Sequence, residues 1–243
     1  MRKEETFYWW HVGRIYFIKQ YLKLLKDRNK IISKKRSLKI FELGCGTGEV
    51  TKELLKFGKT KSIDISPEAI EACLSLGLEA EQADIVSMET GAHVRKYDIA
   101  VALDVLEHIR DDVTAIKKIH KILNKNGHFI ITVPAYKFLW SEHDEALHHC
   151  RRYHTFELQK KLEQNGFEIV KKSHFVFTAF VPIVFFRFWN NIFGRRVQPK
   201  TSYVHLPKFL NDFAINVLKV ESKIINKISL PVGTTLFFMA RKI

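Results

Sequence analysis

The chemistry most clearly indicated by this sequence is that of a glycine-rich turn followed by an acid. The run ELGCGTG occupies residues 42–48, at the end of an apolar segment, and a helical pattern begins at about Glu49. Glycine adopts positive φ without strain and leaves room for a ligand to lie against the backbone. An acid about 20 residues further on is where ribose hydroxyl groups would be bound, and Asp64 stands there. Together these features predict the first half of a nucleotide-binding α/β unit.

The spacing of the glycines narrows the class of ligand. Gly44, Gly46 and Gly48 give G-x-G-x-G, whereas dinucleotide-binding enzymes carry G-x-G-x-x-G. None of these glycines is followed by Gly-Lys-Ser/Thr at the G-x-x-x-x-G-K-S/T spacing, so a P-loop is excluded. With Glu42 before the glycines, the turn resembles the first motif of the class I S-adenosylmethionine-dependent methyltransferases, which looks like E-L-G-C-G-T-G. The resemblance runs from about residue 40 to residue 134 and returns at the C-terminus.

The resemblance implies an α/β fold, with a Rossmann-like seven-stranded sheet, an antiparallel last strand and helices on both faces. It implies S-adenosyl-L-methionine as the methyl donor and S-adenosyl-L-homocysteine as the product. Asp64 would meet the ribose and Asp84 the adenine. Asp104 would form the floor of the pocket, and Glu42 with the glycines would surround the methionine part. The full set of implied cofactor residues is Glu42, Gly44, Cys45, Gly46, Gly48, Asp64, Ile65, Asp84, Ile85, Asp104 and Val105.

Apolar runs bounded by polar turns place the elements of this fold. The predicted strands cover residues 40–43, 78–84, 97–104, 128–134, 167–174 and 234–241, and a further strand ends at Asp64. One predicted helix begins at Glu49, and three others cover residues 67–76, 111–123 and 155–164. Thr155 is the predicted cap of the last helix, and a turn is predicted at residues 124–127. All of this fits one methyltransferase domain over residues 1–243.

The segment DVLEHI at residues 104–109 follows the most apolar strand. Ligands in open α/β sheets lie beyond the carboxyl ends of the strands, so this segment should face the site. In the ubiquinone-pathway O-methyltransferases a similar segment looks like E-x-x-E-H and holds a divalent metal. Here Asp104 replaces the first Glu and shortens one ligand, so we expect no metal. Glu107 and His108 would then form local hydrogen bonds and shape the pocket.

Residues 135–165 form a substrate-side segment that is crowded with titratable and aromatic side chains. A similar V-P-A…L-W-S…H-H-x-R-R-Y run recurs in a type 11/12-like branch of methyltransferases with sugar, quinone or lipid-linked acceptors. Histidine titrates near neutrality and can serve as a general base, and the predicted catalytic candidates are Tyr136, His148 and His149. The alternative is that the histidines are loop and cap residues and that the arginines pair with Asp144 or Glu145.

Aromatic and basic side chains are the candidates for binding the acceptor. Arginine can hold a phosphate or carboxylate through two hydrogen bonds. The predicted substrate-binding residues are Trp9, Trp10, Trp140, Arg151 and Arg152. The two N-terminal tryptophans begin an amphipathic helix within residues 1–30. The family resemblance implies that this helix caps the cofactor. The alternative is a helix that only packs on the edge of the sheet.

Residues 176–232 form a hydrophobic helical insertion before the last strand. Its first apolar run is about a dozen residues long, whereas a membrane-spanning helix needs about 20. The insertion is therefore predicted to be either a buried helical hairpin, packed on itself and on the N-terminal helix, or a lid that lies in a membrane interface. Basic residues that follow the run would suit anionic head groups.

The composition limits the kinds of binding partner and the cellular compartment that we expect. The net charge of +14 favours an anionic partner such as an anionic membrane surface, although a generally basic surface is an equal alternative. No motif for specific nucleic-acid binding occurs. Three scattered cysteines and no signal peptide indicate a reducing, cytoplasmic location, with peripheral contact at the inner face of the membrane as an option. The oligomeric state stays open.

The combined prediction is an S-adenosylmethionine-dependent methyltransferase that acts on an apolar or lipid-linked small-molecule acceptor. The acceptor atom is predicted to be a hydroxyl oxygen, and the reaction to take place at or near a membrane surface. One alternative is a soluble O-methyltransferase for a sugar or quinone-like molecule. Another is a non-catalytic module that binds the cofactor and uses its insertion to hold a partner protein.

Overall fold

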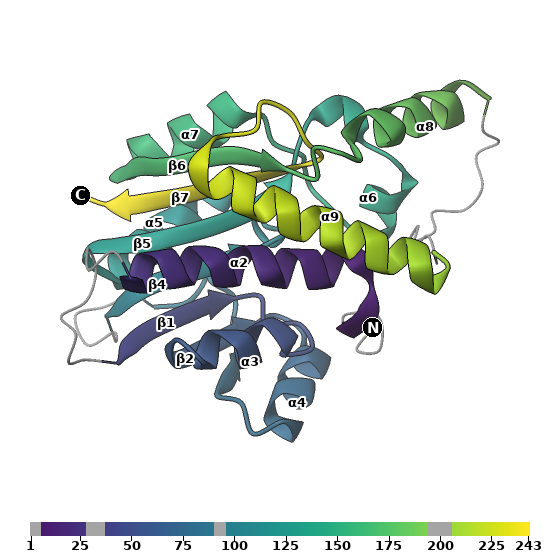
Figure 1. The fold of residues 1–243 in the computed structure, drawn as a ribbon. Coiled ribbons are helices and arrows are strands. Elements are labelled where there is room, and N and C mark those ends of the chain that lie inside the picture. Colours follow the sequence, from purple (N-terminus) through teal and green to yellow (C-terminus); the bar gives the residue numbers. More distant parts are fainter. Residues whose placement is uncertain (1–5, 28–36, 90–95, 194–205) are drawn as a thin grey trace.

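The chain forms one mixed sheet between two layers of helices (Figure 1). The computed structural model describes residues 6–27, 37–89, 96–193 and 206–243. The strands are β1 (Leu38–Leu43), β2 (Gly58–Asp64), β3 (Ala80–Gln82), β4 (Tyr97–Leu103), β5 (Leu123–Pro134), β6 (Phe167–Phe175) and β7 (Thr235–Lys242). Their order in the sheet is β3-β2-β1-β4-β5-β7-β6.

The sheet has the predicted methyltransferase topology. Strands β1 to β5 are parallel to one another, and β7 lies antiparallel between β5 and β6. From β1 the chain moves outward through β2 and β3, and it then returns to the other side of β1 with β4. This reversal is a topological switch point, where the carboxyl ends of β1 and β4 splay apart and ligands bind.

Helices cover both faces of the sheet. They are α2 (Trp9–Asp27), α3 (Glu49–Leu55), α4 (Pro67–Ser75), α5 (Asp112–Ile122), α6 (Glu142–Ala146), α7 (Thr155–Gln164), α8 (Phe180–Phe193) and α9 (Lys208–Lys227), with 3-10 turns η1 (Leu106–His108) and η2 (Lys137–Leu139). Helices α5 and α7 pack in the core on one face, and α2, α3 and α9 pack in the core on the other. Strand β4 is buried along its whole length between them.

The insertion divides into two helices with different neighbours. Helix α9 lies alongside α2, whereas α8 extends from the end of β6 toward α6 (Figure 1). The predicted packing of the insertion on the N-terminal helix is therefore correct for α9. None of the helices in the described ranges is long and apolar enough to cross a membrane.

Several predicted boundaries were wrong for local reasons. Residues 124–127 were predicted to form a turn but belong to β5. Asn126 adopts φ 61° beside a shift in the β4–β5 register, so these turn-forming residues lie in an irregular part of the strand. Strand β3 is only three residues long. The N-cap position of α7 is His154, not Thr155, and no side chain caps that helix. The predicted fourth strand is one residue shorter, because Asp104 turns out of it with φ 56°.

Candidate functional site

The glycine turn closes tightly on its neighbours. Gly44, Gly46 and Gly48 have φ values of 80°, 50° and 85°, a region that other residues enter only with strain. A Cβ atom on Gly44 would lie 2.4 Å from Cγ2 of Val105, and one on Gly48 would lie 2.6 Å from Cδ1 of Leu78. A Cβ on Gly46 would meet no atom within 4 Å, so its backbone conformation alone favours glycine there. The turn thus brings bare backbone to the carboxyl end of β1.

Asp64 connects this turn to the next helix. Its Oδ2 accepts a hydrogen bond from the backbone N–H of Gly46 at 2.9 Å, and its Oδ1 accepts one from the N–H of Ser66 at 3.0 Å. Ser66 in turn caps α4, because its hydroxyl accepts from the N–H of Ala69. The carboxylate that was predicted to meet a ribose is therefore held in one orientation by two backbone amides.

A pocket of about 340 Å³ opens beside the turn. Ile65 stands in its wall with 70% of its surface exposed, and Asp84 is exposed beside it. Apolar walls with acids such as Asp64 and Asp84 are suited to a nucleoside, which has an apolar base and a hydroxylated sugar. The lining residues are Leu43, Gly44, Asp64, Ile65, Ala83, Asp84, Ile85, Val86, Val105, His108, Ile109, Arg110 and Asp111.

The pocket gathers six of the predicted cofactor residues, and Glu42 is not among them. Glu42 is buried between β1, β2 and α3, where its Oε2 accepts hydrogen bonds from the hydroxyls of Thr51 (2.5 Å) and Ser62 (2.6 Å). Burial raises the pKa of Glu42 to about 7, against the two hydrogen bonds, which lower it. Through these two hydrogen bonds, Glu42 links β1 to β2 and to α3, the helix that follows the turn.

This buried acid predicts a pH dependence of stability. The folded pKa of about 7 lies above the unfolded value of about 4.3, so between these pH values the folded chain binds more protons. The stabilising contribution is complete below pH ~4 and is lost as the pH rises through ~7. We expect the free energy of unfolding of the native chain to fall by about 2 kcal/mol between pH 5 and pH 8, relative to Glu42→Gln.

Urea unfolding of both proteins across this range measures the difference. The glutamine side chain keeps an oxygen that can accept from both hydroxyls but does not titrate, so it is a matched control. Parallel stability curves for the two proteins would show that Glu42 is ionised throughout.

Cys45 is buried in a small apolar cluster and does not line the pocket. It packs with Ile70, Cys73 and Leu78, and burial raises the pKa of its thiol. The thiol of Cys73 donates to the carbonyl of Gly46 at 3.7 Å. The two sulfur atoms therefore support the underside of the turn, and neither has the character of a nucleophile.

The carboxyl end of β4 is tied to the N-terminal helix. Oδ2 of Asp104 lies 2.6 Å from Nη1 of Arg14, and Oδ1 accepts a hydrogen bond from the hydroxyl of Thr132 at 3.0 Å. The neighbouring Val105 lines the pocket, whereas Asp104 itself does not. Sequence reasoning missed Arg14, although a lone arginine on an apolar helix face is a signal that it has a buried partner.

The predicted group of Asp104, Glu107 and His108 is rearranged in the structure. Asp104 pairs with Arg14, and His149 takes its place beside Glu107 and His108, with one nitrogen or oxygen atom from each of the three residues within 4.8 Å of the others. The rings of His108 and His149 meet edge to face at 4.7 Å. Burial, with the charge of Asp104 adding to it, raises the pKa of Glu107 well above its ordinary value. Neither oxygen of Glu107 has a hydrogen-bond partner among the described residues, so the predicted local hydrogen bonding was wrong for this side chain.

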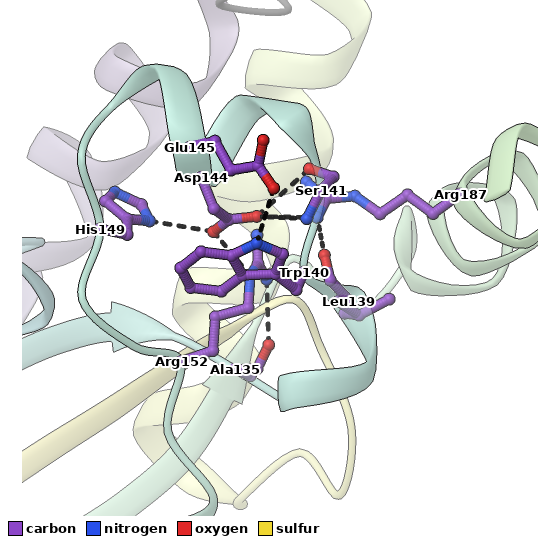
Figure 2. A network of polar contacts seen from close by, with 9 residues as sticks. All are labelled: Ala135, Leu139, Trp140, Ser141, Asp144, Glu145, His149, Arg152 and Arg187. Carbon is purple, nitrogen blue, oxygen red and sulfur yellow. Dashed lines mark hydrogen bonds and ion pairs between the residues drawn. The ribbon is translucent and has the colours of Figure 1, made fainter. Parts of the chain in front are cut away.

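His149 is held by a buried carboxylate, Asp144 (Figure 2). Nδ1 of His149 lies 2.9 Å from Oδ1 of Asp144, and Nε of Arg152 donates to the same oxygen at 2.7 Å. Since a carboxylate only accepts, Nδ1 of His149 carries the hydrogen and Nε2 is the nitrogen that can take up a proton. Although burial raises it, the pKa of Asp144 is held well below its usual range by His149 and Arg152.

The other predicted catalytic residues have different surroundings. His148 is exposed and follows α6 with φ 55°. Tyr136 has φ 60°, and its hydroxyl lies 2.9 Å from Nε2 of His174. Because Nδ1 of His174 faces the carbonyl of Leu230 at 3.2 Å, Nε2 is the acceptor and the tyrosine hydroxyl donates. No motif links positions 136 and 174, so this pair could not be predicted from the sequence.

The predicted substrate-binding residues are already engaged within the chain. Arg152 is buried against Asp144, as the alternative stated, whereas Arg151 pairs at 3.2 Å with Asp112, a partner that the alternative did not name. Trp140 donates to Glu145 at 3.4 Å. The backbone N–H of Trp9 donates to Asn211 of α9, and the ring of Trp10 packs 5.7 Å from that of Phe175.

Comparison with known proteins identifies the family. Residues 10–172 match the family described as "Methyltransferase domain". The chain is 26% identical over 99 residues to the ubiquinone biosynthesis O-methyltransferase of Actinobacillus pleuropneumoniae serotype 5b, covering 37% of this chain and 42% of that protein. It is 26% identical over 163 residues to the protein of the same name from Dinoroseobacter shibae, with coverage of 58% and 64%. The chain thus spans less than two thirds of the length of either relative.

Solved structures agree at the level of the fold. A SAM-dependent methyltransferase from Archaeoglobus fulgidus superposes with a TM-score of 0.60 at 16% identity, covering 98% of this chain and 97% of that one. An S-adenosylmethionine-dependent methyltransferase from Mesorhizobium loti gives a TM-score of 0.57 at 15% identity, covering 92% and 96%. The chain therefore belongs to the methyltransferase domain family, and its fold is that of the class I S-adenosylmethionine-dependent methyltransferases.

Proposed function

We propose that the protein transfers a methyl group from S-adenosylmethionine to a hydroxyl group of an apolar small molecule. The observation that carries this proposal is the pocket of about 340 Å³ at the switch point of the sheet, with bare glycine backbone on one side and Asp64 and Asp84 on another. The match to proteins named as ubiquinone biosynthesis O-methyltransferases supports a small-molecule acceptor and an oxygen as the methylated atom.

The residues present fit the cofactor. The backbone at Gly44 admits a ligand that a side chain would exclude, Asp64 offers oxygens to ribose hydroxyls, and Ile65 offers an apolar surface to the base. When bound, S-adenosylmethionine supplies a methyl group on a positively charged sulfur. Because that group is already activated, the protein has to orient the two partners and exclude water.

We assign His149 as the base that accepts the proton of the acceptor's hydroxyl group. Its Nδ1 donates to Asp144, which fixes the ring and leaves Nε2 free to accept a proton from a hydroxyl. Arg152 in turn holds Asp144 and donates to the carbonyl of Ala135 at 3.0 Å. Once protonated, His149 returns the proton to solvent.

We further propose that the acceptor is linked to a lipid and that the protein meets it at a membrane surface. Helix α8 exposes Val181, Phe185 and Trp189 by 72%, 65% and 54%, and their spacing of four residues puts them on one face. Helix α9 exposes Phe209 and Phe213 by 70% and 67%. Exposed aromatic side chains on a chain with a net charge of +14 are suited to an anionic interface.

Vesicle binding tests this surface. The double substitution Phe185→Ser with Trp189→Ser should reduce co-sedimentation with anionic phosphatidylglycerol vesicles at least tenfold, because two large apolar side chains leave the interface. Phe156→Ser is the matched control, since Phe156 is 76% exposed but stands on α7, away from α8 (Figure 1). Equal loss in the control, or no binding by the native chain, would remove the membrane from the proposal.

The activity itself is tested by a transfer assay. The protein is incubated with methyl-labelled S-adenosylmethionine and, separately, with lipid and aqueous extracts of the source cell. Label in the lipid phase is the expected result. Label only in the aqueous phase would favour a soluble acceptor, and no label despite intact cofactor binding would favour a non-catalytic module.

A further inference from the structure

One wall of the pocket beside the glycine turn is a short connection between β4 and α5. Residues 108–111 line the pocket and lie at the end of η1 and in the link that follows it. The backbone N–H groups of His108 and Ile109 bond within the connection itself, at 3.0 Å and 3.2 Å. Its other polar backbone groups need partners from elsewhere in the chain, because a connection of this kind has no ladder or helix to satisfy them.

The chain that follows α6 supplies such partners one after another. The backbone N–H of Cys150 donates to the carbonyl of Glu107 at 2.7 Å, and its thiol donates to the carbonyl of His108 at 3.3 Å. The hydroxyl of Tyr153 lies 3.1 Å from the carbonyl oxygen of Leu106. All of these donors come from one segment and all of the acceptors from the other, so the two segments are held edge to edge.

Arg151 connects two points of the wall through one guanidinium group. Its Nη2 donates to the carbonyl of Arg110 at 2.6 Å, and its Nη1 lies 3.2 Å from Oδ2 of Asp112. These two acceptors stand on either side of Asp111, which lines the pocket and caps α5. A planar guanidinium holds two acceptors in a fixed geometry, which the point charge of a lysine does not. Arg151 thus fixes the wall where the connection enters α5.

The start of α5 does not depend on Arg151 alone. The carboxylate of Asp112 is buried, and its Oδ2 also lies 2.5 Å from Nζ of Lys161 and 2.7 Å from the hydroxyl of Tyr153. Loss of Arg151 would leave this carboxylate with one cation and one hydroxyl. It would remove the side chain that holds the carbonyl of Arg110, so the expected damage is to the wall rather than to the helix.

The same segment also borders the network of Asp144 (Figure 2). His149 and Arg152 contact Asp144, whereas the residue between them that carries the other guanidinium, Arg151, contacts the wall of the pocket. One short segment is therefore shared by the pocket and by the network that holds the residue assigned as the base.

We infer that Arg151 is a positioning residue for the cofactor: it holds residues 108–111 in place as the wall against which bound S-adenosylmethionine lies. The inference rests on the proposed placement of the cofactor in this pocket. It assigns Arg151 to the cofactor, in place of the acceptor-binding role expected from the sequence.

Isothermal titration with S-adenosylhomocysteine tests the inference. Arg151→Met keeps the apolar part of the side chain and should bind this product about tenfold more weakly, because charge-assisted hydrogen bonds no longer hold the wall. Lys161→Met is the matched control, since Lys161 pairs with the same carboxylate from α7. It should lose stability and keep the native affinity. If Arg151→Met does not fold, Arg151→Lys, which keeps the charge but not the planar geometry, takes its place.

The dependence of the transfer rate on S-adenosylmethionine gives a second readout, with the lipid extract as the source of acceptor. In Arg151→Met the KM for S-adenosylmethionine should rise about tenfold, and the rate at saturating S-adenosylmethionine should stay within about twofold of the native rate. A merely structural role would lower the active fraction of the protein, and thus the saturated rate, without moving this KM.

Two results would overturn the inference and leave the proposed function standing. One is native affinity for S-adenosylhomocysteine in folded Arg151→Met, and the other is an equal loss of affinity in Lys161→Met. If the native chain itself binds no S-adenosylhomocysteine, the inference and the proposed cofactor site both fail.

Discussion

Replacing Asp144 by alanine should lower the free energy of unfolding by about 3–5 kcal/mol, the cost of breaking a buried ion pair by removing one partner. The Asp144 side chain is fully buried and pairs with Arg152, which is 5% exposed. Its loss leaves a buried guanidinium without a counter-charge and takes the acceptor from the N–H of Ser141 and from Nδ1 of His149. Urea unfolding followed by circular dichroism measures the change.

Glu145→Ala is the control for this substitution. Glu145 is adjacent and exposed, and its contact with Trp140 is a weak one at 3.4 Å, so we expect a change within about 0.5 kcal/mol. Asp144→Asn separates shape from charge, since the amide keeps the volume but cannot balance Arg152. A loss below about 1 kcal/mol in Asp144→Ala would mean that Arg152 reaches solvent or another partner, and the network would then not hold His149.

The second large effect concerns the cofactor. Gly44→Ala should weaken the binding of S-adenosylhomocysteine at least tenfold, because the new Cβ would lie 2.4 Å from Val105 in the wall of the pocket and must displace it. The positive φ of 80° adds a backbone cost of about 1–2 kcal/mol. Isothermal titration of the purified variants gives the affinities.

Gly77→Ala is matched for the backbone cost. Gly77 has φ 70° and a Cβ there would meet no atom within 4 Å, so the variant should lose stability but keep the native affinity. If both alanine variants bind S-adenosylhomocysteine as tightly as the native chain does, the ligand does not lie against Gly44. If both lose affinity equally, general destabilisation explains the effect.

Much of the fold could be predicted because its signals are local. Runs such as residues 97–103 are apolar apart from Asp98, which is typical of a central parallel strand, and the glycines of the turn have the positive φ that glycine allows. The capping sequence at Ser66 and Pro67 also gave the start of α4 correctly. The chain reversal after β3 then places Asp64, Asp84 and Val105 around one pocket, as the motif implied.

The parts that could not be predicted depend on contacts between distant segments. Arg14 meets Asp104 across 90 positions, and Arg187 meets Asp144 across 43. The resemblance places Glu42 among the cofactor residues, and nothing in that motif indicates that hydroxyls from α3 and β2 engage its carboxylate inside the fold. An ion pair between distant segments leaves no periodic pattern that identifies its partner, even where a lone arginine such as Arg14 signals that one exists.

The central claim, that S-adenosylmethionine occupies the pocket beside the glycine turn, is tested most directly by photolabelling. The chain is irradiated with methyl-labelled S-adenosylmethionine, digested, and the labelled peptides are identified by mass spectrometry. We predict label in peptides that contain Asp64–Ile65 or residues 83–86, and its loss in Gly44→Ala. Label confined to α8 or α9, or label that persists in Gly44→Ala, would contradict the account.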